Sequence, residues 1–290
     1  TLKQGESVTI DMKKYFAGGL DGVGAYDGHH DVFNNVVYNW GGRATDGGSH
    51  EVNFVNNYYK MGPATTQKKL FRLQLEGTGS GTQSAYVNGN IRQAAGNGAL
   101  TEDKLKDTYV YETSHGQVVN WEPFVSKPFF ESLAAIESAK AAYKNVLCDV
   151  GANQPFLDNH DTRMVNETLA GTTTTVGSQS GKKGLIDSEE DKGCEGFKGL
   201  NITEAKRDAN WDTDLDGMPD WWEEVKGISD GNADENGDGY TNLEEYLNWL
   251  AEPHFTLKQG ESVTIDMKKY FAGYTNNPQF ECEAKGDAMS

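Results

Sequence analysis

Short apolar runs interrupted by asparagines recur between Asp31 and Gln93. Three segments share this pattern: HDVFNNVVYNW, VNFVNNYYK and, more loosely, SAYVNGNIRQ. Their asparagines are Asn34-Asn35, Asn56-Asn57, which follow 22 residues later, and Asn88 and Asn90. A β-branched or aromatic run, an asparagine pair and a turn make one coil of a parallel β-helix, whose stacked coils align the amides in a ladder. Two β-hairpins are the weaker alternative, because hairpin turns favour Asn-Gly. We predict β-helix coils over residues 20–125.

Beyond the coils, the apolar spacing changes from that of strands to that of helices. Residues 128–150 show near-helical spacing, and we expect two helices with a break near Glu137, where Ser138 restarts the helix as an N-cap and Gly151 ends it. A further helix is predicted over residues 159–170, stopped by Gly171. A flexible connection over residues 171–184 follows. Residues 126–205 thus form a predicted helical and loop extension.

The two ends of the chain carry the same segment. TLKQGESVTIDMKKYFAG occurs at residues 1–18 and again at residues 256–273. Because old duplications drift, we interpret this identity as a recent rearrangement, a cloning feature or an assembly error. Alternating apolar positions, including Val263 and Ile265 in the second copy, predict a half-buried strand. We expect residues 1–19 to be a duplicated segment and residues 252–290 to begin an incomplete β-sandwich-like module.

The stretch from Asp212 to Glu245 carries the clearest chemistry. Two twelve-residue registers each place oxygen-bearing side chains at positions 1, 3, 5, 9 and 12, a glycine at position 6 and a backbone carbonyl at position 7. This is the pattern of an EF-hand calcium loop, since calcium takes six to eight oxygen ligands. The predicted ligands are Asp212, Asp214, Asp216, Met218, Asp220 and Glu223 in the first loop, and Asp234, Asn236, Asp238, Tyr240, Asn242 and Glu245 in the second.

A solvated acidic turn is the alternative interpretation of this stretch, because Asp, Asn and Gly also form turns. Two complete registers favour calcium, and the twelve acidic residues and one lysine between Asp212 and Glu245 would repel one another without a cation. We predict structural Ca²⁺ in a module over residues 206–251. Helices should follow near Pro219 and over residues 242–250. The second should dock on the adjacent body through Leu243, Tyr246, Leu247 and Leu250.

Composition narrows the possible partners. The 290 residues carry a net charge of −18 and a pI near 4.7, which makes nucleic acid and anionic membranes poor partners. No run reaches the length of a membrane span. Three cysteines, Cys148, Cys194 and Cys282, allow at most one disulfide. Weak calcium loops suit a secreted, periplasmic or cell-surface protein. Thr1 begins no signal peptide, so we expect a mature or truncated form.

Several segments carry a family resemblance. NNVVYNWGGRATDGG, VNFVNNYYKMGPAT, AYKNVLCDVGANQP, DNHDTRMVNETLAG, DTDLDGMPDWWE and DGYTNLEEYLN resemble, in family order over residues 31–250, the C-terminal part of pectate lyases of polysaccharide lyase family 1. The two calcium loops of this chain resemble the compact calcium repeats of dockerins. The resemblance implies a mainly β fold, namely a partial right-handed parallel β-helix with a helical C-terminal extension and EF-hand-like calcium loops. It also implies an acidic plant polysaccharide, pectate, as the substrate.

The resemblance implies a mechanism without placing its residues. Such enzymes cleave polygalacturonate by calcium-assisted β-elimination, with an arginine as the base. The family's catalytic groups precede the NNVVYNW coil, and Thr1 to Asp31 contains no arginine. We therefore assign no catalytic residue and expect the chain to lack the catalytic half. Arg43 is the cation nearest to the first coil. The hypotheses are a pectate lyase, a calcium-stabilised structural module with a possible protein partner, and a carbohydrate-binding protein using Trp40, Trp221 and Trp222.

Overall fold

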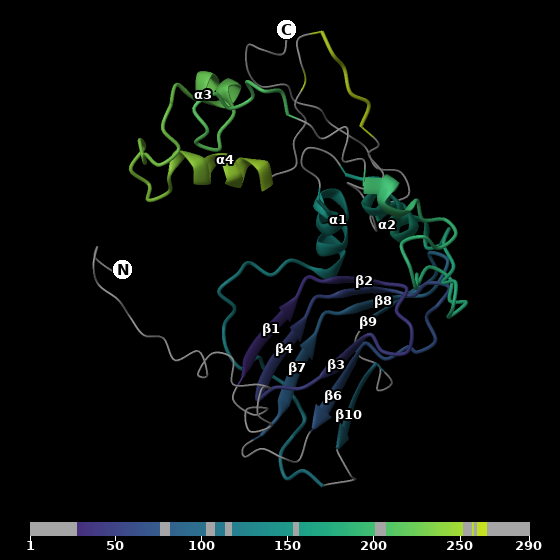
Figure 1. Ribbon diagram of the computed structural model, residues 1–290. Helices are drawn as coiled ribbons and strands as arrows, with labels where there is room; N and C mark the ends of the chain where they lie inside the picture. The colour runs from purple at the N-terminus through teal and green to yellow at the C-terminus, as the bar shows by residue number, and fades with distance from the viewer. Residues whose placement is uncertain are drawn as a thin grey trace.

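Parallel strands dominate the structure, a computed structural model that describes residues 28–75, 82–102, 108–113, 118–152, 157–200, 207–251, 257 and 260–265. The strands are β1 (His29–Phe33), β2 (Val36–Tyr38), β3 (Thr45–Gly47), β4 (Glu51–Val55), β5 (Tyr58–Lys60), β6 (Phe71–Leu75), β7 (Ser84–Asn88), β8 (Ile91–Gln93), β9 (Leu100–Glu102), β10 (Tyr109–Thr113) and β11 (Phe124–Val125). The helices are α1 (Ala139–Asp149), α2 (Asn159–Ala170), the 3-10 helix η3 (Gly196–Leu200), α3 (Asp220–Lys226) and α4 (Asn242–Ala251). The strands form one body, over which α1 and α2 lie (Figure 1).

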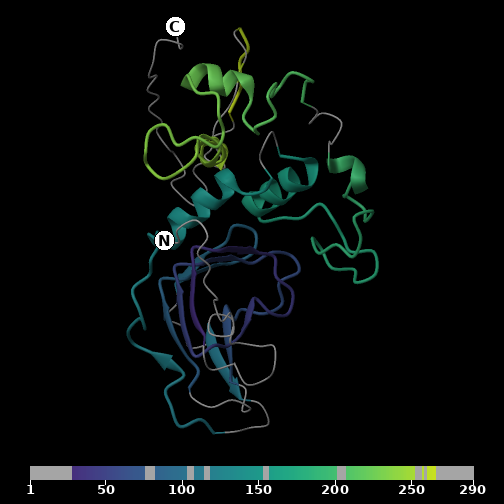
Figure 2. The same cartoon turned by 60° about the vertical axis from the view of Figure 1, so that its left-hand side comes forward.

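The strands form three sheets with the orders β1-β4-β7-β11, β2-β5-β8-β9 and β10-β6-β3. Every pairing is parallel except that of β8 with β9. His29 lies opposite Glu51, and Val36 lies opposite Tyr58, so successive coils stack at the predicted spacing of 22 residues. Figure 2 shows the coils winding around a common interior. Parallel pairing excludes the hairpin alternative and is consistent with a β-helix-like fold, whose right-handed winding stays a prediction.

The two residues of each asparagine pair have different roles: the first makes a turn, and the second forms hydrogen bonds between coils. The first residue turns the chain sharply between two strands, with a positive φ at Asn34 (53°), Asn56 (52°) and, in the third coil, Gly89 (69°). Asparagine and glycine are the residues that adopt this left-handed conformation at least cost. The second residue then faces along the stack. The loosely matching third coil therefore follows the rule, with Gly89 rather than Asn88 at the turn.

The second asparagines form the predicted ladder. The backbone N–H and the side-chain Nδ2 of Asn35 both donate to Oδ1 of Asn57, at 3.0 and 2.9 Å. Asn57 donates in the same way to Oδ1 of Asn90, at 2.9 and 2.8 Å. Asn57 and Asn90 are fully buried, whereas Asn35 is exposed. Buried amides without partners would cost free energy, so these bonds let polar side chains occupy the interior.

Apolar side chains fill the rest of the stack. One cluster of buried residues contains Trp40, Val52, Phe54, Tyr59, Leu70, Phe71, Leu73, Leu75 and Ala85. The rings of Phe54 and Phe71 stack with centroids 4.8 Å apart. Since Phe54 lies on β4 and Phe71 on β6, this contact holds two sheets together. Burial of large apolar side chains is the main favourable contribution to the folding of such a stack.

A buried lysine connects the stack to both helices of the extension. Lys60, which is 1% exposed, donates from Nζ to the hydroxyl of Tyr143 on α1 (3.0 Å) and to the carbonyl of Leu169 on α2 (3.1 Å). Burial lowers the pKa of Lys60 to about 8. A second contact is the stacking of Tyr58 on Tyr143, with centroids 4.2 Å apart. The helices thus pack against the strands, as their apolar faces predicted.

The extension confirms one predicted helix in full and corrects the first. Helix α2 has the predicted bounds and ends at Gly171 with a φ of 69°. Ser138 caps α1, but residues 128–137 are not helical, so the prediction of a helix before Glu137 was wrong. The physical reason is that this segment hydrogen-bonds to the stack. Glu137 N–H donates to Asn34 Oδ1 at 2.9 Å, and Phe129 N–H donates to Asn53 Oδ1 at 3.1 Å.

The predicted flexible connection over residues 171–184 is instead held in place. Val176 and Lys183 form an antiparallel bridge. The carbonyls of Thr172 and Lys183 accept hydrogen bonds from Tyr38 (2.7 Å) and Asn39 (2.9 Å). Glu167, which is 5% exposed, accepts from the backbone and hydroxyl of Thr174. Backbone carbonyls thus fix the segment to the first coil, and Thr174 fixes it to α2.

The duplicated segment falls almost wholly outside the described residues. The predictions for residues 1–19 lie outside them, as do those for residues 252–290 apart from 257 and 260–265. Val263 and Ile265 are 43% and 40% exposed and do not form the predicted half-buried strand. Across the described residues, no helix combines the length and apolar character needed to cross a bilayer.

Candidate functional site: two acidic loops and a small cationic pocket

Two loops of twelve residues, 212–223 and 234–245, lead into α3 and α4. Their backbones match position by position. The sixth residues, Gly217 and Gly239, have φ values of 102° and 98°, and the fourth residues, Leu215 and Gly237, have φ values of 64° and 72°. A φ near 100° is open to glycine and strained for other residues. The glycine at position 6 therefore provides the sharp turn that the sequence pattern predicted.

The first side chain of each loop holds that turn in the same way. Asp212 accepts hydrogen bonds from the N–H groups of Leu215 (2.8 Å) and Gly217 (3.0 Å). Asp234 accepts from the N–H groups of Gly237 (2.8 Å) and Gly239 (3.0 Å). In each loop, the N–H at position 9 also donates to the carbonyl of the residue before position 1. Both sequences therefore fold into one backbone shape around their first carboxylate.

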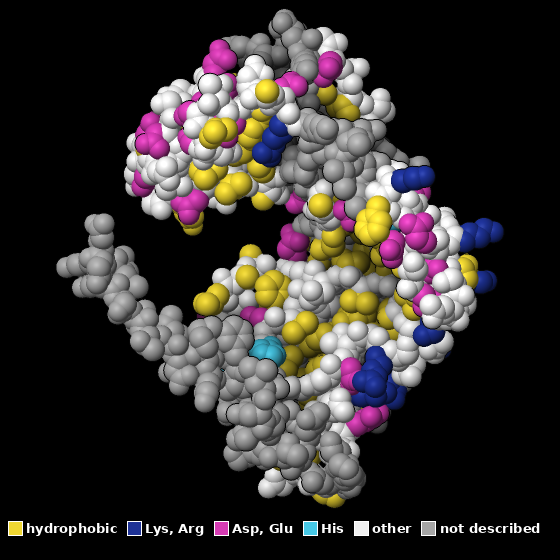
Figure 3. Space-filling view, in the orientation of Figure 1, with side chains coloured by type: hydrophobic (Ala, Val, Ile, Leu, Met, Phe, Trp, Pro, Cys, Tyr) yellow, Lys and Arg dark blue, Asp and Glu magenta, His cyan; other side chains and the backbone are white. Residues whose placement is uncertain are grey.

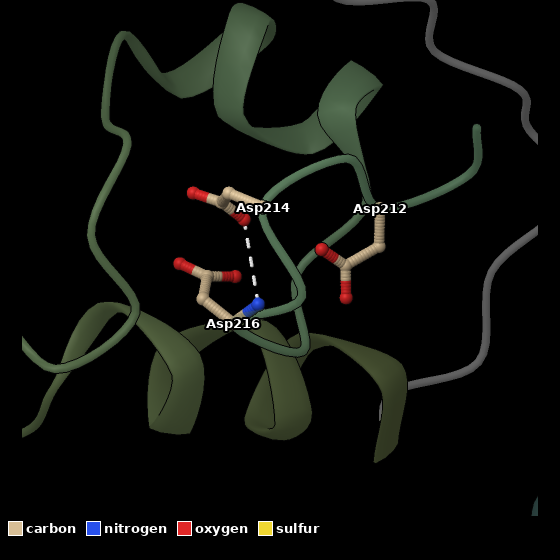
Figure 4. A group of neighbouring side chains, drawn as sticks. All are labelled: Asp212, Asp214 and Asp216. Carbon is tan, nitrogen blue, oxygen red and sulfur yellow. Dashed lines mark hydrogen bonds between the residues drawn. The ribbon is translucent and has the colours of Figure 1, made fainter.

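The first loop gathers three carboxylates. Oxygens of Asp212, Asp214 and Asp216 all lie within 4.8 Å of one another. Figure 4 shows the side chains of Asp214 and Asp216 beside each other, with the backbone N–H of Asp216 donating to Asp214 at 3.3 Å. Asp216 in turn accepts from the N–H of Met218 at 2.9 Å. Like charges this close raise the energy of one another, and a bound cation would relieve that repulsion.

Glu223, at position 12, faces the same group of carboxylates. Its pKa is raised, first by desolvation and then by the negative charges of Asp214, Asp216, Asp220 and Asp212. The first turn of α3 brings Glu223 to the loop, since this helix begins at Asp220. The residues at positions 1, 3, 5 and 12 of the first loop thus form one group of negative charge.

The second loop brings together its third, fifth and twelfth residues. Nδ2 of Asn236 donates to Glu245 at 2.5 Å and to Asp238 at 3.3 Å. Oδ1 of Asn236 accepts from the N–H of Asp238 at 3.0 Å, and Asp238 accepts from Tyr240 at 2.9 Å. The two backbone N–H contacts repeat, at the same loop positions, those of Asp214, Asp216 and Met218. The second loop differs in having an amide where the first has a carboxylate.

The residues at position 9 do not join these groups. Asp220 accepts from the backbone and the hydroxyl of Thr213, at 2.7 and 2.6 Å, and these bonds lower its pKa. Asn242 is 3% exposed and donates to the carbonyl of Asp230 at 2.8 Å. Both side chains brace the loop backbone in the structure. Position 9 often reaches calcium through a water molecule, so this placement leaves the predicted register intact.

Aromatic residues hold the two loops against each other. Met218, Trp222 and Tyr246 form a buried cluster, with Leu243, Trp249 and Leu250 packed against it. Asp216 also accepts from the N–H of Gly231, which leads into the second loop. The prediction that Leu247 faces the adjacent body was wrong, since it is 52% exposed, and α4 packs on α3 instead. The apolar residues of α4 thus pack mainly within this small module.

A second polar group lies beside β3 and β6. Asp46 accepts from Arg43 at 2.6 Å and lies 3.9 Å from Arg72, which also pairs with Glu112 at 3.4 Å. Oδ1 of Asp46 is buried and has no hydrogen-bond partner among the described residues. Lys69 completes the lining of a small pocket here. Figure 3 shows Lys and Arg side chains gathered with acidic ones on the side of the molecule where β3, β6 and β10 lie.

The sequence alone indicated Arg43 but not the partners that complete this group. Asp46, Lys69 and Arg72 come from two coils, and only the pairing of β3 with β6 brings them together. Arg72 lies opposite Val110 on β10, and Glu112, two residues further along β10, reaches it diagonally. Alternation along β6 places Arg72 on the outer face of the strand, a signal that the sequence contains but that names no partner.

The other predicted residues are placed as follows. Trp40 is 5% exposed and Trp222 is 4% exposed, and both pack in cores, whereas Trp221 is 38% exposed. Cys148 and Cys194 are half-buried, and Sγ of Cys148 donates to the carbonyl of Asn145 at 3.1 Å. The atoms that the two acidic loops offer to a metal are oxygens. The asparagine side chains offer an oxygen once their amide groups are rotated by half a turn. Such a donor set fits a hard cation of the calcium type, not zinc or copper.

Comparison with known proteins gives one consistent relationship. No family model matches the chain. Proteins named "Probable pectate lyase C" from Aspergillus flavus and Aspergillus fumigatus are each 30% identical to it, over 233 and 232 residues. Each alignment covers 77% of this chain and 49% of the relative. The chain thus spans about half the length of these curated relatives. The similarity supports a pectate lyase-like family for the chain, consistent with its parallel sheets.

Proposed function

We propose that this chain is part of a secreted, calcium-dependent pectate lyase-like protein whose β-stack binds an acidic plant polysaccharide. The similarity over 77% of the chain to proteins named as pectate lyases carries this proposal. The domain bounds proposed from the sequence, residues 20–125, 126–205 and 206–251, divide the described part into β-coils, extension and acidic-loop module. Right-handed winding of the coils and a periplasmic or cell-surface location belong to the same proposal.

The surface around the small pocket beside β3 and β6 is the part of the chain best suited to a polyanion. A protein with a net charge of −18 repels polygalacturonate, so binding needs local cations. Arg43 is exposed beside Lys69 and Arg72, and guanidinium groups pair with carboxylates in bidentate fashion. These groups bind and orient a uronate, and we assign no catalytic base.

Two measurements separate binding from catalysis. The chain is incubated with polygalacturonate and calcium while the absorbance of unsaturated uronide is followed. A signal supports a lyase, and no signal at high protein concentration rejects catalysis by this chain. Binding is measured by affinity electrophoresis in polygalacturonate gels. Arg43→Gln and Arg72→Gln should abolish retardation, whereas Arg163→Gln, which changes the same charge on α2, should not. Equal retardation of all the variants would reject the surface around this pocket as the binding site.

We further propose that both acidic loops are EF-hand-like, dockerin-type Ca²⁺ sites with a structural role. Position by position, the donors are Asp212, Asp214, Asp216, Met218, Asp220 and Glu223, and Asp234, Asn236, Asp238, Tyr240, Asn242 and Glu245. The matching backbone turns and the clustered carboxylates support this assignment. A bound Ca²⁺ would neutralise the clustered charge. The protein's own residues set the turn at Gly217 and deliver Glu223 from α3, while Met218 and Trp222 belong to the buried cluster that holds the two loops together.

Chelation tests the calcium proposal. Ca²⁺ that binds only the native state at 100 times its dissociation constant adds about 2.7 kcal/mol to the free energy of unfolding. We expect EDTA to lower the melting temperature, and Glu223→Gln and Glu245→Gln each to reduce that difference. Glu224→Gln is the matched control, because Glu224 is the exposed neighbour of Glu223 on α3. Identical melting curves with and without chelator would reject structural calcium.

A calcium-stabilised interaction module without catalysis is the second candidate function. Exposed apolar side chains on the acidic-loop module favour it, since Val225 is 74% exposed, Leu247 52% and Trp221 38%. Figure 3 shows hydrophobic side chains on the side of this module that faces the β-stack and acidic ones on its outer side. A protein partner would cover such side chains. Pull-down in calcium but not in EDTA would support this function, and its absence in both would reject it.

A further inference from the structure

Two histidines and a glutamate meet where β1 and β4 begin. His29 lies opposite Glu51 in the pairing of the two strands, and His50 is the residue before Glu51. Nδ1 of His29 lies 2.8 Å from Oε2 of Glu51, and Nε2 of His50 lies 3.7 Å from Oε1. The two imidazole rings meet edge to face, with centroids 5.6 Å apart. One carboxylate thus lies between two imidazoles from successive coils.

The hydrogen bond of His50 determines which of its ring nitrogens can bind a ligand. Nδ1 lies 2.8 Å from the carbonyl oxygen of Thr82, which only accepts hydrogen bonds, so Nδ1 carries the proton. Nε2 of the neutral ring then has a free lone pair, and its neighbour Oε1 of Glu51 also has only lone pairs. A backbone carbonyl that holds the other ring nitrogen is the usual arrangement of a metal-binding histidine. A cation between Nε2 and Oε1 would satisfy both atoms.

The separations match those of ligands around one tetrahedral ion. With bonds of about 2.0–2.1 Å, two ligand atoms lie roughly 3.3 Å apart, and the centroids of two bound imidazoles lie roughly 5 Å apart. The observed 2.8 and 3.7 Å bracket the first value, and 5.6 Å is close to the second. His29 is the ligand that must adjust, because a metal replaces its hydrogen bond to Glu51. Its side chain is 57% exposed, which leaves it room to turn.

The surroundings of the three side chains suit a cation of the zinc type. Two imidazoles and one carboxylate are ligands that Zn²⁺ takes, whereas Ca²⁺ prefers a shell of oxygens. Asp31 lies two residues along β1 on the same face as His29, and its Oδ1 accepts from Nδ2 of Asn53 at 3.0 Å. Its charge favours a cation nearby. Phe130 packs edge to face on His29, with centroids 6.0 Å apart, and makes one side of the group apolar.

We propose that His29, His50 and Glu51 bind one Zn²⁺-type cation, with water as the fourth ligand. Three protein ligands leave one position of a tetrahedral ion open. Since His29 belongs to the first coil and the other two ligands to the second, the ion cross-links successive coils. Thr82, just before β7, ties the third coil to the site through His50. The inference depends neither on calcium in the acidic loops nor on lyase activity.

Calorimetric titration of the full chain with Zn²⁺ tests this proposal, with Ca²⁺ in excess to fill the acidic loops. His50→Gln and Glu51→Gln should each weaken Zn²⁺ binding at least about tenfold, since even groups that only orient a metal ligand are worth that much. His30→Gln is the matched control, because alternation along β1 points the exposed His30 to the opposite face from His29. It should leave Zn²⁺ binding unchanged. Equal affinities of His50→Gln and His30→Gln would overturn the proposal.

Chemical modification of the unmutated chain is a second test, which does not require any variant to fold. Diethyl pyrocarbonate reacts with imidazole nitrogens that have a free lone pair, and tandem mass spectrometry locates the modified histidines. In excess Ca²⁺, Zn²⁺ should protect His29 and His50 and leave His30 reactive. Mg²⁺ at the same concentration should protect none of them, because it prefers oxygen ligands. Protection of all three histidines alike, or of none, by Zn²⁺ would overturn the proposal.

Discussion

Asn57 offers the sharpest test of the ladder, because one fully buried side chain serves three neighbours. Its Oδ1 accepts twice from Asn35, and its Nδ2 donates to Val32 and Asn90. Asn57→Ala leaves buried groups of these neighbours without partners, at about 1–3 kcal/mol for each group. Some of the bonds can rearrange, so we expect a loss of about 3–5 kcal/mol in the free energy of unfolding.

The matched control lies in the same ladder. Asn35→Ala removes the same atoms from an exposed rung, where water replaces the lost partners. We expect it to cost about 1 kcal/mol. Urea denaturation followed by circular dichroism at constant calcium gives both values, and hydrogen exchange of β4 and β5 amides assigns the loss to the stack. Equal destabilisation by the two substitutions, or a cost below 1 kcal/mol for Asn57→Ala, would refute the argument that burial sets the value of each rung.

Two further predictions concern a buried charge and a turn. Burial lowers the pKa of Lys60 to about 8, so above that pH the unfolded chain binds more protons than the folded one. The free energy of unfolding should therefore rise by about 2 kcal/mol from pH 7 to 10. At higher pH it should fall, because burial raises the pKa of Tyr59 to about 12 and the tyrosine ionises first in the unfolded chain. Lys60→Met should abolish that rise in denaturant titrations, and an unchanged slope would exclude Lys60 as its source. Gly217→Ala, at a φ of 102°, should cost about 1–3 kcal/mol and reduce the calcium-dependent gain in melting temperature. Gly227→Ala, also at positive φ but after α3, should leave that gain intact, and equal gains in both variants would contradict a calcium role for the turn.

Local and repeating patterns made much of the fold predictable. The spacing of Asn34-Asn35 and Asn56-Asn57 predicted parallel stacking, because a coil must return its chain to the same height in every turn. The bounds of α2 followed from Asn159 and Gly171, since glycine readily adopts the positive φ that ends a helix. The two acidic registers predicted the matching turns at Gly217 and Gly239. In each case, residues close in sequence determine the outcome.

The misses share a different cause. Residues 128–137 have helical spacing, but Asn34 and Asn53 bind their backbone, and these partners lie far away in sequence. No pattern around Lys60 indicated its burial, which the distant helices α1 and α2 provide. The group of Asp46 and Arg72 depends on the pairing of two sheet strands from different coils. Long-range partners decided these outcomes, and the pattern within one segment does not contain them.

The hydrogen bonds that join the first coil to the residues after α2 have a consequence for the order of folding. Tyr38 and Asn39 bond to Thr172 and Lys183, which lie 134 and 144 residues further along the chain. Contacts of such separation form late, since each closes a long loop. During synthesis, Tyr38 and Asn39 of the first coil thus lack these partners until the chain has grown past residue 184. A ribosome-bound chain arrested before that point should remain sensitive to protease at its first coil.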